Sequence, residues 1–284
     1  MDMQKIQWFP GHMTKAVRMM EENIKLVDAV IFVLDARAPF ACRNRMLEKK
    51  LGNKPFLYVL NKCDLISESA RDVIISEFKR EGKIAVTSVG VKAGGCKSVM
   101  AGLKNILSEK IERNKAKGVN KILRAMVVGV PNTGKSTVIN ALCGKKATMV
   151  GDKAGVTRGK QWVKLDGFEL LDTPGTMPPS MDNNLLGLHL AYIGGLNDAI
   201  LDMGDLCLSF IGEMQELYSN SLTEKYGVEV NEKTPLEIYE DICKKRGFLL
   251  KGGIYDYERC AKAVIDDFRK GRLGKLCLEE KASL

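Results

Sequence analysis

Two short motifs stand in an unusual order along this chain. Residues 129–136, GVPNTGKS, match the phosphate-binding pattern G-x-x-x-x-G-K-[ST] in full. Residues 61–64, NKCD, match N-K-x-D, a pattern suited to reading a guanine base, and they come first. Ras-type nucleotide-binding domains carry the two motifs in the reverse order. The sequence therefore predicts a circular permutation, which moves the chain ends without necessarily moving the site.

The first part of the chain alternates between strand-like and helix-like patterns. Apolar stretches, most of them rich in β-branched residues, begin at residues 29, 55, 84 and 122, and the pair QWVKLDG and FELLDTPG follows. Helical spacing separates most of them. This alternation predicts an α/β domain with a mostly parallel sheet and helices on both faces. The candidate motifs all fall at the carboxyl ends of strands, where such sheets bind ligands.

From about residue 185 the apolar residues recur at helical spacing only. We therefore expect a nucleotide-binding domain over residues 1–180 and a small helical domain over residues 181–284. Charge is unevenly placed, because residues 181–240 carry two lysines against eleven acids, whereas residues 244–275 carry ten Lys or Arg against four acids. With a net charge of +9, this favours an anionic partner such as nucleic acid.

Other features exclude several classes of protein. The eight cysteines include no C-x-x-C pair, so neither a zinc site nor a redox motif is indicated. No apolar run approaches the roughly 18 residues that a membrane helix needs. The first residues lack the layout of a signal peptide. These observations predict a cytoplasmic protein without a membrane partner.

The phosphate loop and two later motifs predict a phosphate and Mg²⁺ site. The loop amides and Lys135 suit the β- and γ-phosphates, and Ser136 suits Mg²⁺. In DTPG, Asp172 suits Mg²⁺ and the amide of Gly175 suits the γ-phosphate. Thr157, in GDKAGVTRG, suits both Mg²⁺ and the γ-phosphate, with an ordinary loop threonine as the alternative.

The NKCD motif predicts selection of guanine. Asp64 can accept hydrogen bonds from two guanine nitrogens that adenine does not offer, while Asn61 and Lys62 brace the base and the loop. Ser88, at the end of the next strand, can contact the guanine O6. The full set of predicted GTP contacts is Asn61, Lys62, Asp64, Ser88, Val130, Pro131, Asn132, Thr133, Gly134, Lys135, Ser136, Thr137 and Gly175.

Taken in order, these residues resemble the circularly permuted GTPases and, among them, the YlqF/RbgA family, ribosome biogenesis GTPase A. The resemblance spans essentially the whole chain and rests on IQWFPGHM at 6–13, DAR at 35–37, NKCD, GVPNTGKS, GVTRGKQW at 155–162, LLDTPG, and the tail YDYERCAKAVIDDFRKGRLG. It implies a circularly permuted Ras-like P-loop GTPase domain followed by a small all-helical C-terminal domain.

The resemblance also implies catalytic residues. Ras-like enzymes place a water-orienting glutamine directly after D-x-x-G, where this chain has Thr176, which is too short for that task. The family instead implies His12 as the group that positions the water, although a lone histidine is more often structural. Lys135 and Thr157 complete the catalytic candidates. Asn132 resembles the asparagine that helps some such GTPases bind K⁺, and a plain loop asparagine is the alternative.

The implied function is GTP hydrolysis during late assembly of the large ribosomal subunit. The protein would bind rRNA and ribosomal proteins with GTP and Mg²⁺, be stimulated by the particle, and leave after hydrolysis. We expect a monomer when free, and the lack of a leader before IQWFPGHM favours a bacterial-type cytoplasm. The alternatives are a GTP-gated RNA-binding module with incidental hydrolysis, or a P-loop ATPase or small-molecule kinase.

The motif order predicts how the two domains communicate. DTPG is the last nucleotide motif before the helices, so the γ-phosphate would reposition them through residues 176–184. The basic tail would contact the RNA backbone, with Tyr255, Tyr257 and Phe268 either stacking on bases or packing within the protein. His189 is expected on a helix surface or in the core.

Overall fold

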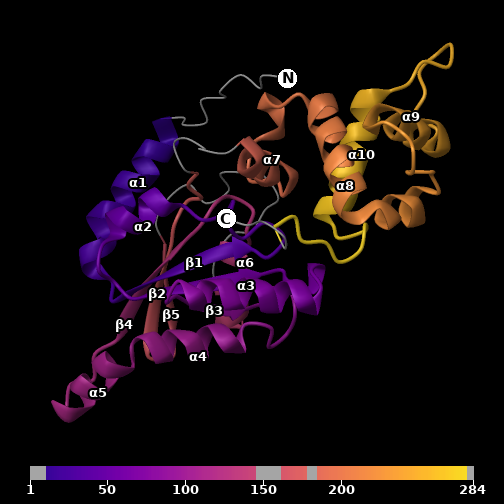
Figure 1. Cartoon of the computed structure of the whole chain (residues 1–284). Helices are drawn as coiled ribbons and strands as arrows, with labels where there is room; N and C mark the ends of the chain where they lie inside the picture. The colour runs from indigo at the N-terminus through magenta and orange to yellow at the C-terminus, as the bar shows by residue number, and fades with distance from the viewer. Residues whose placement is uncertain (1–10, 145–160, 178–183, 280–284) are drawn as a thin grey trace.

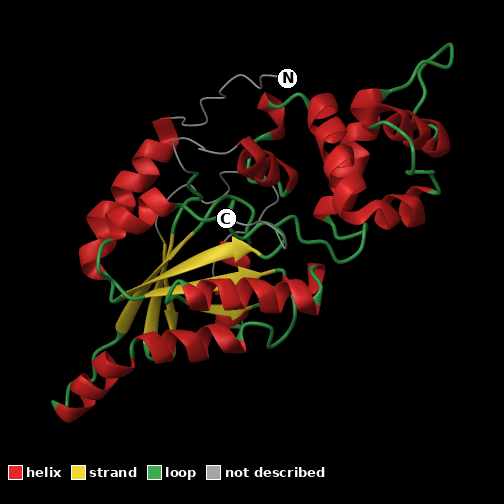
Figure 2. Cartoon of the chain, in the orientation of Figure 1, coloured by secondary structure: helices red, strands yellow, loops and turns green. Residues whose placement is uncertain are grey.

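A six-stranded sheet forms the centre of the molecule in the computed structural model, which describes residues 11–144, 161–177 and 184–279 (Figures 1 and 2). The strand order is β3-β2-β1-β4-β6-β5. All neighbouring pairs are parallel except β5 and β6. The strands are β1 Ala29–Asp35, β2 Phe56–Asn61, β3 Ile84–Thr87, β4 Leu123–Val128, β5 Gln161–Leu165 and β6 Phe168–Asp172. The predicted, mostly parallel sheet is confirmed.

The chain reverses its direction of travel across the sheet next to β1. It runs outward from β1 through β2 to β3 and then returns to place β4 on the other side of β1. In open α/β sheets such a switch point leaves a crevice beyond the carboxyl ends of the two central strands. Asp35 ends β1 and the phosphate loop follows β4, so both border this crevice.

Helices cover both faces of the sheet (Figure 2), because successive residues of each strand point to opposite sides. Phe32 of β1 belongs to one apolar cluster and Ile31 to a second. The first cluster includes residues of α1 Gly11–Asn23, α2 Arg45–Leu51 and α3 Glu68–Arg80. The second includes or is packed against by residues of α4 Lys97–Ile106, α5 Ser108–Ala116 and α6 Lys135–Cys143.

The segment that begins at residue 96 reads as one helix in the sequence but forms two. Its apolar spacing is continuous, yet Leu107 separates α4 from α5 with φ −109° and ψ 8°. Helices α1 and α2 precede this segment in the chain. Both lie against the sheet face that carries the larger apolar cluster, where packing rather than local pattern stabilises them.

Within the described residues, four α-helices make up the C-terminal part, as the apolar spacing predicted. They are α7 Asn184–Tyr192, α8 Met203–Tyr226, α9 Pro235–Arg246 and α10 Tyr257–Arg269. Helix α9 starts with a capping box formed by Thr234 and Glu237, with Pro235 in its first turn. None of the helices in the described ranges combines the length and the apolarity that a bilayer span requires.

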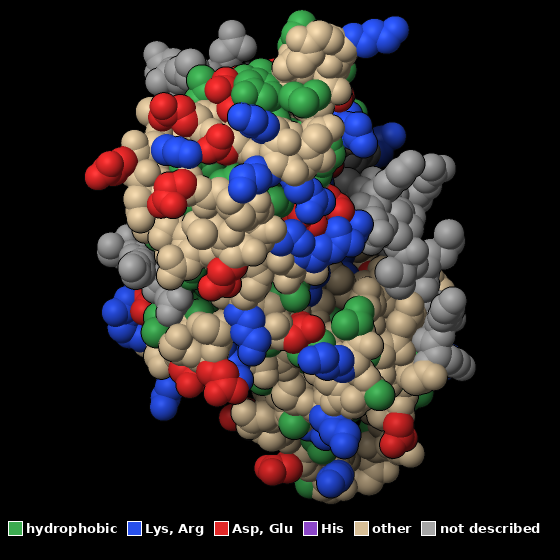
Figure 3. All heavy atoms as spheres, turned by 90° about the vertical axis from the view of Figure 1, so that its right-hand side faces the viewer, with side chains coloured by type: hydrophobic (Ala, Val, Ile, Leu, Met, Phe, Trp, Pro, Cys, Tyr) green, Lys and Arg blue, Asp and Glu red, His purple; other side chains and the backbone are tan. Residues whose placement is uncertain are grey.

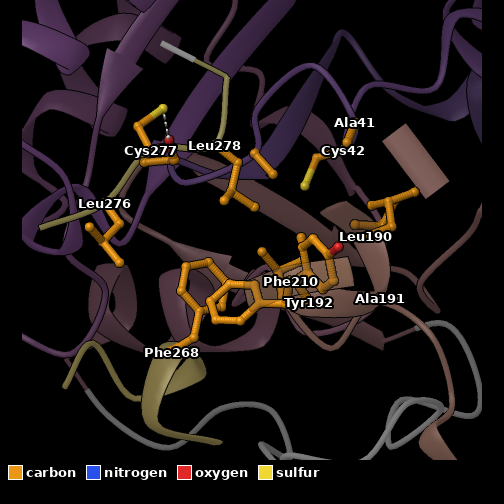
Figure 4. Packing of buried hydrophobic residues seen from close by; sticks show 14 of the residues in the cluster. Ala41, Cys42, Leu190, Ala191, Tyr192, Phe210, Phe268, Leu276, Cys277 and Leu278 are labelled. Carbon is orange, nitrogen blue, oxygen red and sulfur yellow. Dashed lines mark hydrogen bonds between the residues drawn. The ribbon is translucent and has the colours of Figure 1, made fainter. Parts of the chain in front are cut away.

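The C-terminal helices pack directly on the sheet domain. Tyr192, Phe210 and Phe268 point toward one another, with ring centroids 5.1 Å and 5.0 Å apart along that series (Figure 4). After α10 the chain returns to the sheet, where the Leu276 amide donates to the Leu65 carbonyl (2.9 Å). The Leu278 amide donates to the Arg37 carbonyl (2.8 Å). The two parts therefore share one continuous core.

Candidate nucleotide site

The phosphate loop joins β4 to α6 and needs its glycines at two turns. Gly129 has φ 151°, and a Cβ there would lie 2.3 Å from the Val33 carbonyl oxygen. Gly134 has φ 90°, and a Cβ there would lie 2.3 Å from the Asn61 amide nitrogen. Helix α6 begins directly afterwards at Lys135, so the N–H groups of its first turn border the loop. This is the backbone arrangement that binds phosphate at a helix N-terminus.

Lys135, Ser136 and Asp172 come together beside the loop. The Lys135 ammonium donates to the carbonyls of Gly129 (3.0 Å) and Val130 (2.9 Å), and burial lowers its pKa to about 8. The Ser136 hydroxyl donates to Asp172 Oδ2 at 2.9 Å. Burial raises the pKa of Asp172 above its usual value. Two predicted Mg²⁺ ligands are therefore adjacent.

The donor set fits Mg²⁺. Asp172 is fully buried, and its Oδ1 has no hydrogen-bond partner among the described residues. An unpartnered buried carboxylate oxygen is costly unless a cation or water satisfies it. Mg²⁺ typically takes one or two protein oxygens and completes its shell with water and phosphate oxygens. Asp172 and Ser136 would supply the protein oxygens, and bound Mg²⁺ would neutralise charge on the phosphates.

The base motif is tied to the phosphate loop by hydrogen bonds. The Asn61 amide donates to the Thr133 carbonyl (2.9 Å), and its oxygen accepts from the Ser88 hydroxyl (2.9 Å) and the Gly90 amide (3.0 Å). The Lys62 ammonium donates to the Asn132 carbonyl (2.8 Å). Although the sequence separates the two motifs, the fold makes them neighbours, as the permutation predicted.

Asp64 borders a hollow beyond β2 and β3. Ser88, Val89 and Gly95 line the same hollow, and Lys92 approaches Asp64 to 3.9 Å. Lys275, from the segment after α10, also lines it. The hollow lies at the carboxyl ends of the strands, where the sequence placed the guanine contacts.

The remaining predicted loop contacts lie around the same turn. Val130 and Thr133 are fully buried, and Thr137 is half-buried in α6. Gly175 approaches so closely that a Cβ would lie 2.7 Å from the Pro131 nitrogen. DTPG is thus packed against the phosphate loop, which is the placement expected of a γ-phosphate sensor.

Asn132 and Thr176 extend the site toward the C-terminal helices. The Asn132 amide donates to the Gly194 carbonyl (2.6 Å), just after α7. Thr176 donates its backbone N–H to the Gly129 carbonyl (3.2 Å) and is fully buried, so its side chain faces the core. The side chain of His12 and the whole of Thr157 lie outside the described residues, as do residues 178–183 of the expected joint.

Sequence reasoning missed two residues that border this site. Asp35 and Arg37 form a buried ion pair (2.8 Å), and Lys62 also contacts Asp35 at 2.8 Å. The sequence indicated them only through the DAR motif at the end of β1. That motif contributed to the family resemblance, but no structural role was assigned to it. A pair of opposite charges at a strand end beside the switch point can therefore indicate residues that border a functional site.

Comparisons with known proteins fit this geometry. A family model described as "50S ribosome-binding GTPase" matches residues 124–238. A protein named ribosome biogenesis GTPase A from Bacillus cereus is 40% identical over 96% of this chain and 93% of its own length. The chain belongs to the ribosome biogenesis GTPase A family. It is therefore a GTP-hydrolysing enzyme with a role in ribosome biogenesis.

Further members of this family agree. The ribosome biogenesis GTPase A of Thermotoga maritima is 33% identical over 96% of this chain and 94% of its own length. A solved structure described as GDP-bound YlqF has a TM-score of 0.66 at 28% identity, covering 92% of this chain and 98% of that one. GNP-bound YlqF from T. maritima gives 0.66 at 29%, covering 93% and 97%. The predicted family, fold class and guanine-nucleotide binding are thus confirmed.

Proposed function

We propose that this GTPase assists assembly of the large ribosomal subunit in the cytoplasm, binding rRNA of the immature particle with GTP and leaving after hydrolysis. The names of its relatives and the description of the matching family model support this assignment. We keep residues 1–180 as the nucleotide-binding domain and residues 181–284 as the RNA-binding domain, and we propose that the free protein is a monomer.

In the proposed mechanism each part of the site has one task. Lys135 and the loop amides bind phosphate, while Ser136, Asp172 and Thr157 hold Mg²⁺. Asn61, Lys62, Asp64 and Ser88 select guanine. His12 orients the attacking water, and K⁺ beside Asn132 would add positive charge at the phosphates. The adjacency of Ser136 and Asp172 and the tie between Asn61 and the phosphate loop support these roles.

Positive charge on and beside one projecting loop supports the proposed RNA contact. Residues 247–256, between α9 and α10, extend away from the rest of the C-terminal helices (Figure 1). The run 243–255 contains four cations and no acid. Lys and Arg side chains, with acids among them, are spread over the face of the molecule that these helices help to form (Figure 3). Such a surface binds a phosphate backbone.

Eight of the ten cations in residues 244–275 fall into two groups. Lys262, Lys270 and Arg272 pair with acids of α10, and Arg269 pairs with Asp198. By contrast, within the part of the chain that the structure describes, the exposed cations Lys244, Lys245, Arg246 and Lys251 form no ion pair. The second group, which we call the loop cations, therefore has its charge available for a partner.

The aromatic residues of the tail make contacts within the protein. Phe268 is fully buried, and the Tyr257 hydroxyl donates to Glu240 (2.7 Å). Tyr255 and Tyr257 contact each other with ring centroids 5.9 Å apart. The sequence left open whether these aromatic residues stack on bases or pack within the protein, and Phe268 packs within the protein. The proposed RNA contact is accordingly electrostatic.

A matched pair of variants tests the RNA contact. Lys245→Gln/Lys251→Gln removes two loop cations, while Lys262→Gln/Lys270→Gln removes two paired ones and changes the net charge equally. Binding to large-subunit particles is measured from low to high salt. For the loop variant, the slope of the logarithm of the binding constant against the logarithm of the salt concentration should be shallower by about 1.5 to 2. The slope for the control should match that of the wild type. Equal slopes for both variants would contradict the proposal.

Turnover measurements separate the alternatives. GTP hydrolysis is measured with and without large-subunit particles, and ATP is offered as competitor. Stimulation by the particle is expected, and its absence would favour a GTP-gated RNA-binding module. Preference for ATP would favour an ATPase or kinase. Unchanged stimulated turnover in His12→Ala would remove the role proposed for that histidine.

A further inference from the structure

Asp35 is a fully buried carboxylate at the end of β1 with cations on two sides. Arg37 donates to it through Nε (2.9 Å) and Nη2 (2.8 Å), a bidentate contact. Lys62 of the NKCD motif lies 2.8 Å from the same carboxylate, at Oδ2. The Asp35 carboxylate therefore contacts two cations, Lys62 within the NKCD motif and Arg37 outside it.

These contacts keep Asp35 charged inside the protein. Burial alone would raise the pKa of Asp35, but the charges of Arg37 and Lys62 outweigh burial and hold the pKa well below its usual range. A buried charge must keep its partners, because losing one leaves an uncompensated ion. The positions of Arg37 and Lys62 are thus linked to each other.

On one side, Asp35 sets the direction of the Lys62 side chain. Lys62 has a left-handed backbone (φ 61°), and its ammonium reaches both Asp35 and the Asn132 carbonyl of the phosphate loop (2.8 Å). It lies between Asn61, which also holds the loop, and Asp64. Without the carboxylate, the Lys62 side chain would no longer be held between the NKCD motif and the phosphate loop.

On the other side, Arg37 caps the end of α10. Its Nη1 donates to the carbonyls of Phe268 (2.9 Å) and Arg269 (3.1 Å). Its guanidinium also lies 4.8 Å from the centroid of the Phe268 ring. The last carbonyls of a helix have no partner within the helix and carry partial negative charge, so they attract such a cation.

We propose that Asp35 is a positioning residue for the guanine nucleotide, acting through Lys62, and that Arg37 makes nucleotide binding depend on the docking of α10. The proposal rests on the base-reading role proposed above for NKCD. It gives the C-terminal helices a route to the base side of the site, separate from DTPG. By linkage, bound nucleotide must in turn favour the docked position of α10.

A double-mutant cycle tests the first half. The dissociation constant of GDP is measured for Asp35→Asn, Lys62→Ala and the double variant. Each single change should weaken GDP binding roughly tenfold or more, as expected for a hydrogen bond to a charged group. The double variant should be no weaker than Lys62→Ala alone. Additive losses would overturn the role of Asp35.

Controls separate failure of this idea from failure of the site assignment. If Lys62→Ala binds GDP normally, the base-reading role itself is wrong. Glu48→Gln breaks another buried pair, with Arg43 (2.6 Å), and should lower the melting temperature without changing GDP binding. Arg37→Lys keeps the buried charge and covers the case in which Asp35→Asn does not fold. It should weaken GDP binding about threefold or more, and wild-type affinity would overturn the proposal.

Hydrogen exchange tests the second half. In the wild type, GDP should slow exchange at the amides of residues 268–273 severalfold, because docking of α10 is linked to the nucleotide. In Arg37→Lys, saturated with GDP, that slowing should be lost while exchange in the middle of α8 stays unchanged. Slowing of wild-type size in the variant would show that α10 responds by another route and would overturn the coupling.

Discussion

The Nδ1 of His189 lies 2.9 Å from the carboxylate of Glu279. The same carboxylate accepts the backbone N–H groups of Phe40 (2.6 Å) and Ala41 (3.1 Å). On the other side of the ring, Nε2 lies 2.6 Å from Glu213 of α8. One buried imidazole therefore joins α7, α8, the segment after α10 and the loop after β1.

This arrangement predicts that stability falls at high pH. Burial alone would lower the pKa of His189, but hydrogen bonds with Glu213 and Glu279 raise it to about 9, above the usual value of 6.5. The folded state therefore holds the proton more tightly than the unfolded state. The resulting stability is full below about pH 6.5 and is lost as pH rises through 9, up to about 3 kcal/mol.

Denaturation at pH 6.5 and pH 9.5 measures this contribution. His189→Gln removes the titrating group and keeps one hydrogen bond, so the variant should be less stable at pH 6.5 and should approach the wild type at pH 9.5. The comparison between the two proteins cancels groups that titrate in both, such as Lys135 with its pKa of about 8. Parallel pH profiles would contradict the prediction.

Asp172→Asn should separate activity from stability. The carboxylate is buried with one oxygen unpartnered, so neutralising it should not lower the stability of the nucleotide-free protein. GTP turnover should require at least tenfold more Mg²⁺, because a charged ligand is lost. Asp35→Asn is the contrast, since that carboxylate is fully paired and its loss should lower the melting temperature. A large loss of stability in Asp172→Asn would refute this.

Gly194→Ala should loosen the contact between the phosphate loop and the helices. Gly194 has φ 76°, and an added Cβ would lie 3.2 Å from Arg269 Nε and 3.5 Å from the Asn132 amide nitrogen. Gly118→Ala is the matched control, because its φ is 64° and nothing lies within 4 Å. The control should lose about 1 to 2 kcal/mol of unfolding free energy, and Gly194→Ala should lose more. Equal losses in urea denaturation would mean that the neighbours adjust freely.

Asp64→Asn should change the preferred base. A carboxylate accepts two hydrogen bonds from guanine, whereas an amide presents one donor and one acceptor. We expect GTP binding to weaken at least tenfold and binding of xanthosine triphosphate, which offers an acceptor in place of the amino group, to improve. Competition between the two nucleotides measures the switch. An unchanged preference would remove Asp64 from the base contact.

The sequence predicted the parts of this molecule that depend on local pattern. Strand β1 is buried on both faces and reads as a continuous apolar run, and the loop glycines are required by backbone geometry. Helix α2 is seven residues long, and so short a helix is stabilised by packing rather than by local pattern.

The parts of the site that the sequence did not predict depend on residues far apart in the chain. Asp35 and Arg37 look like surface charges at a strand end until α10 covers them. Likewise, His189 was expected on a surface or in the core, and nothing in its own helix indicates Glu279 as a partner. Charge pairs of this kind have no periodicity, so only the folded chain reveals them.

The return of the chain to β1 after α10 has a consequence for biosynthesis. Leu278 completes a hydrogen bond with Arg37, and Glu279 covers the loop that follows. At roughly 5–20 residues per second, residue 278 is made on the order of 10–50 s after residue 37. The nascent domain must wait that long with the loop after β1 uncovered, so a chain interrupted before residue 276 would carry both nucleotide motifs and still lack the segment that closes their domain.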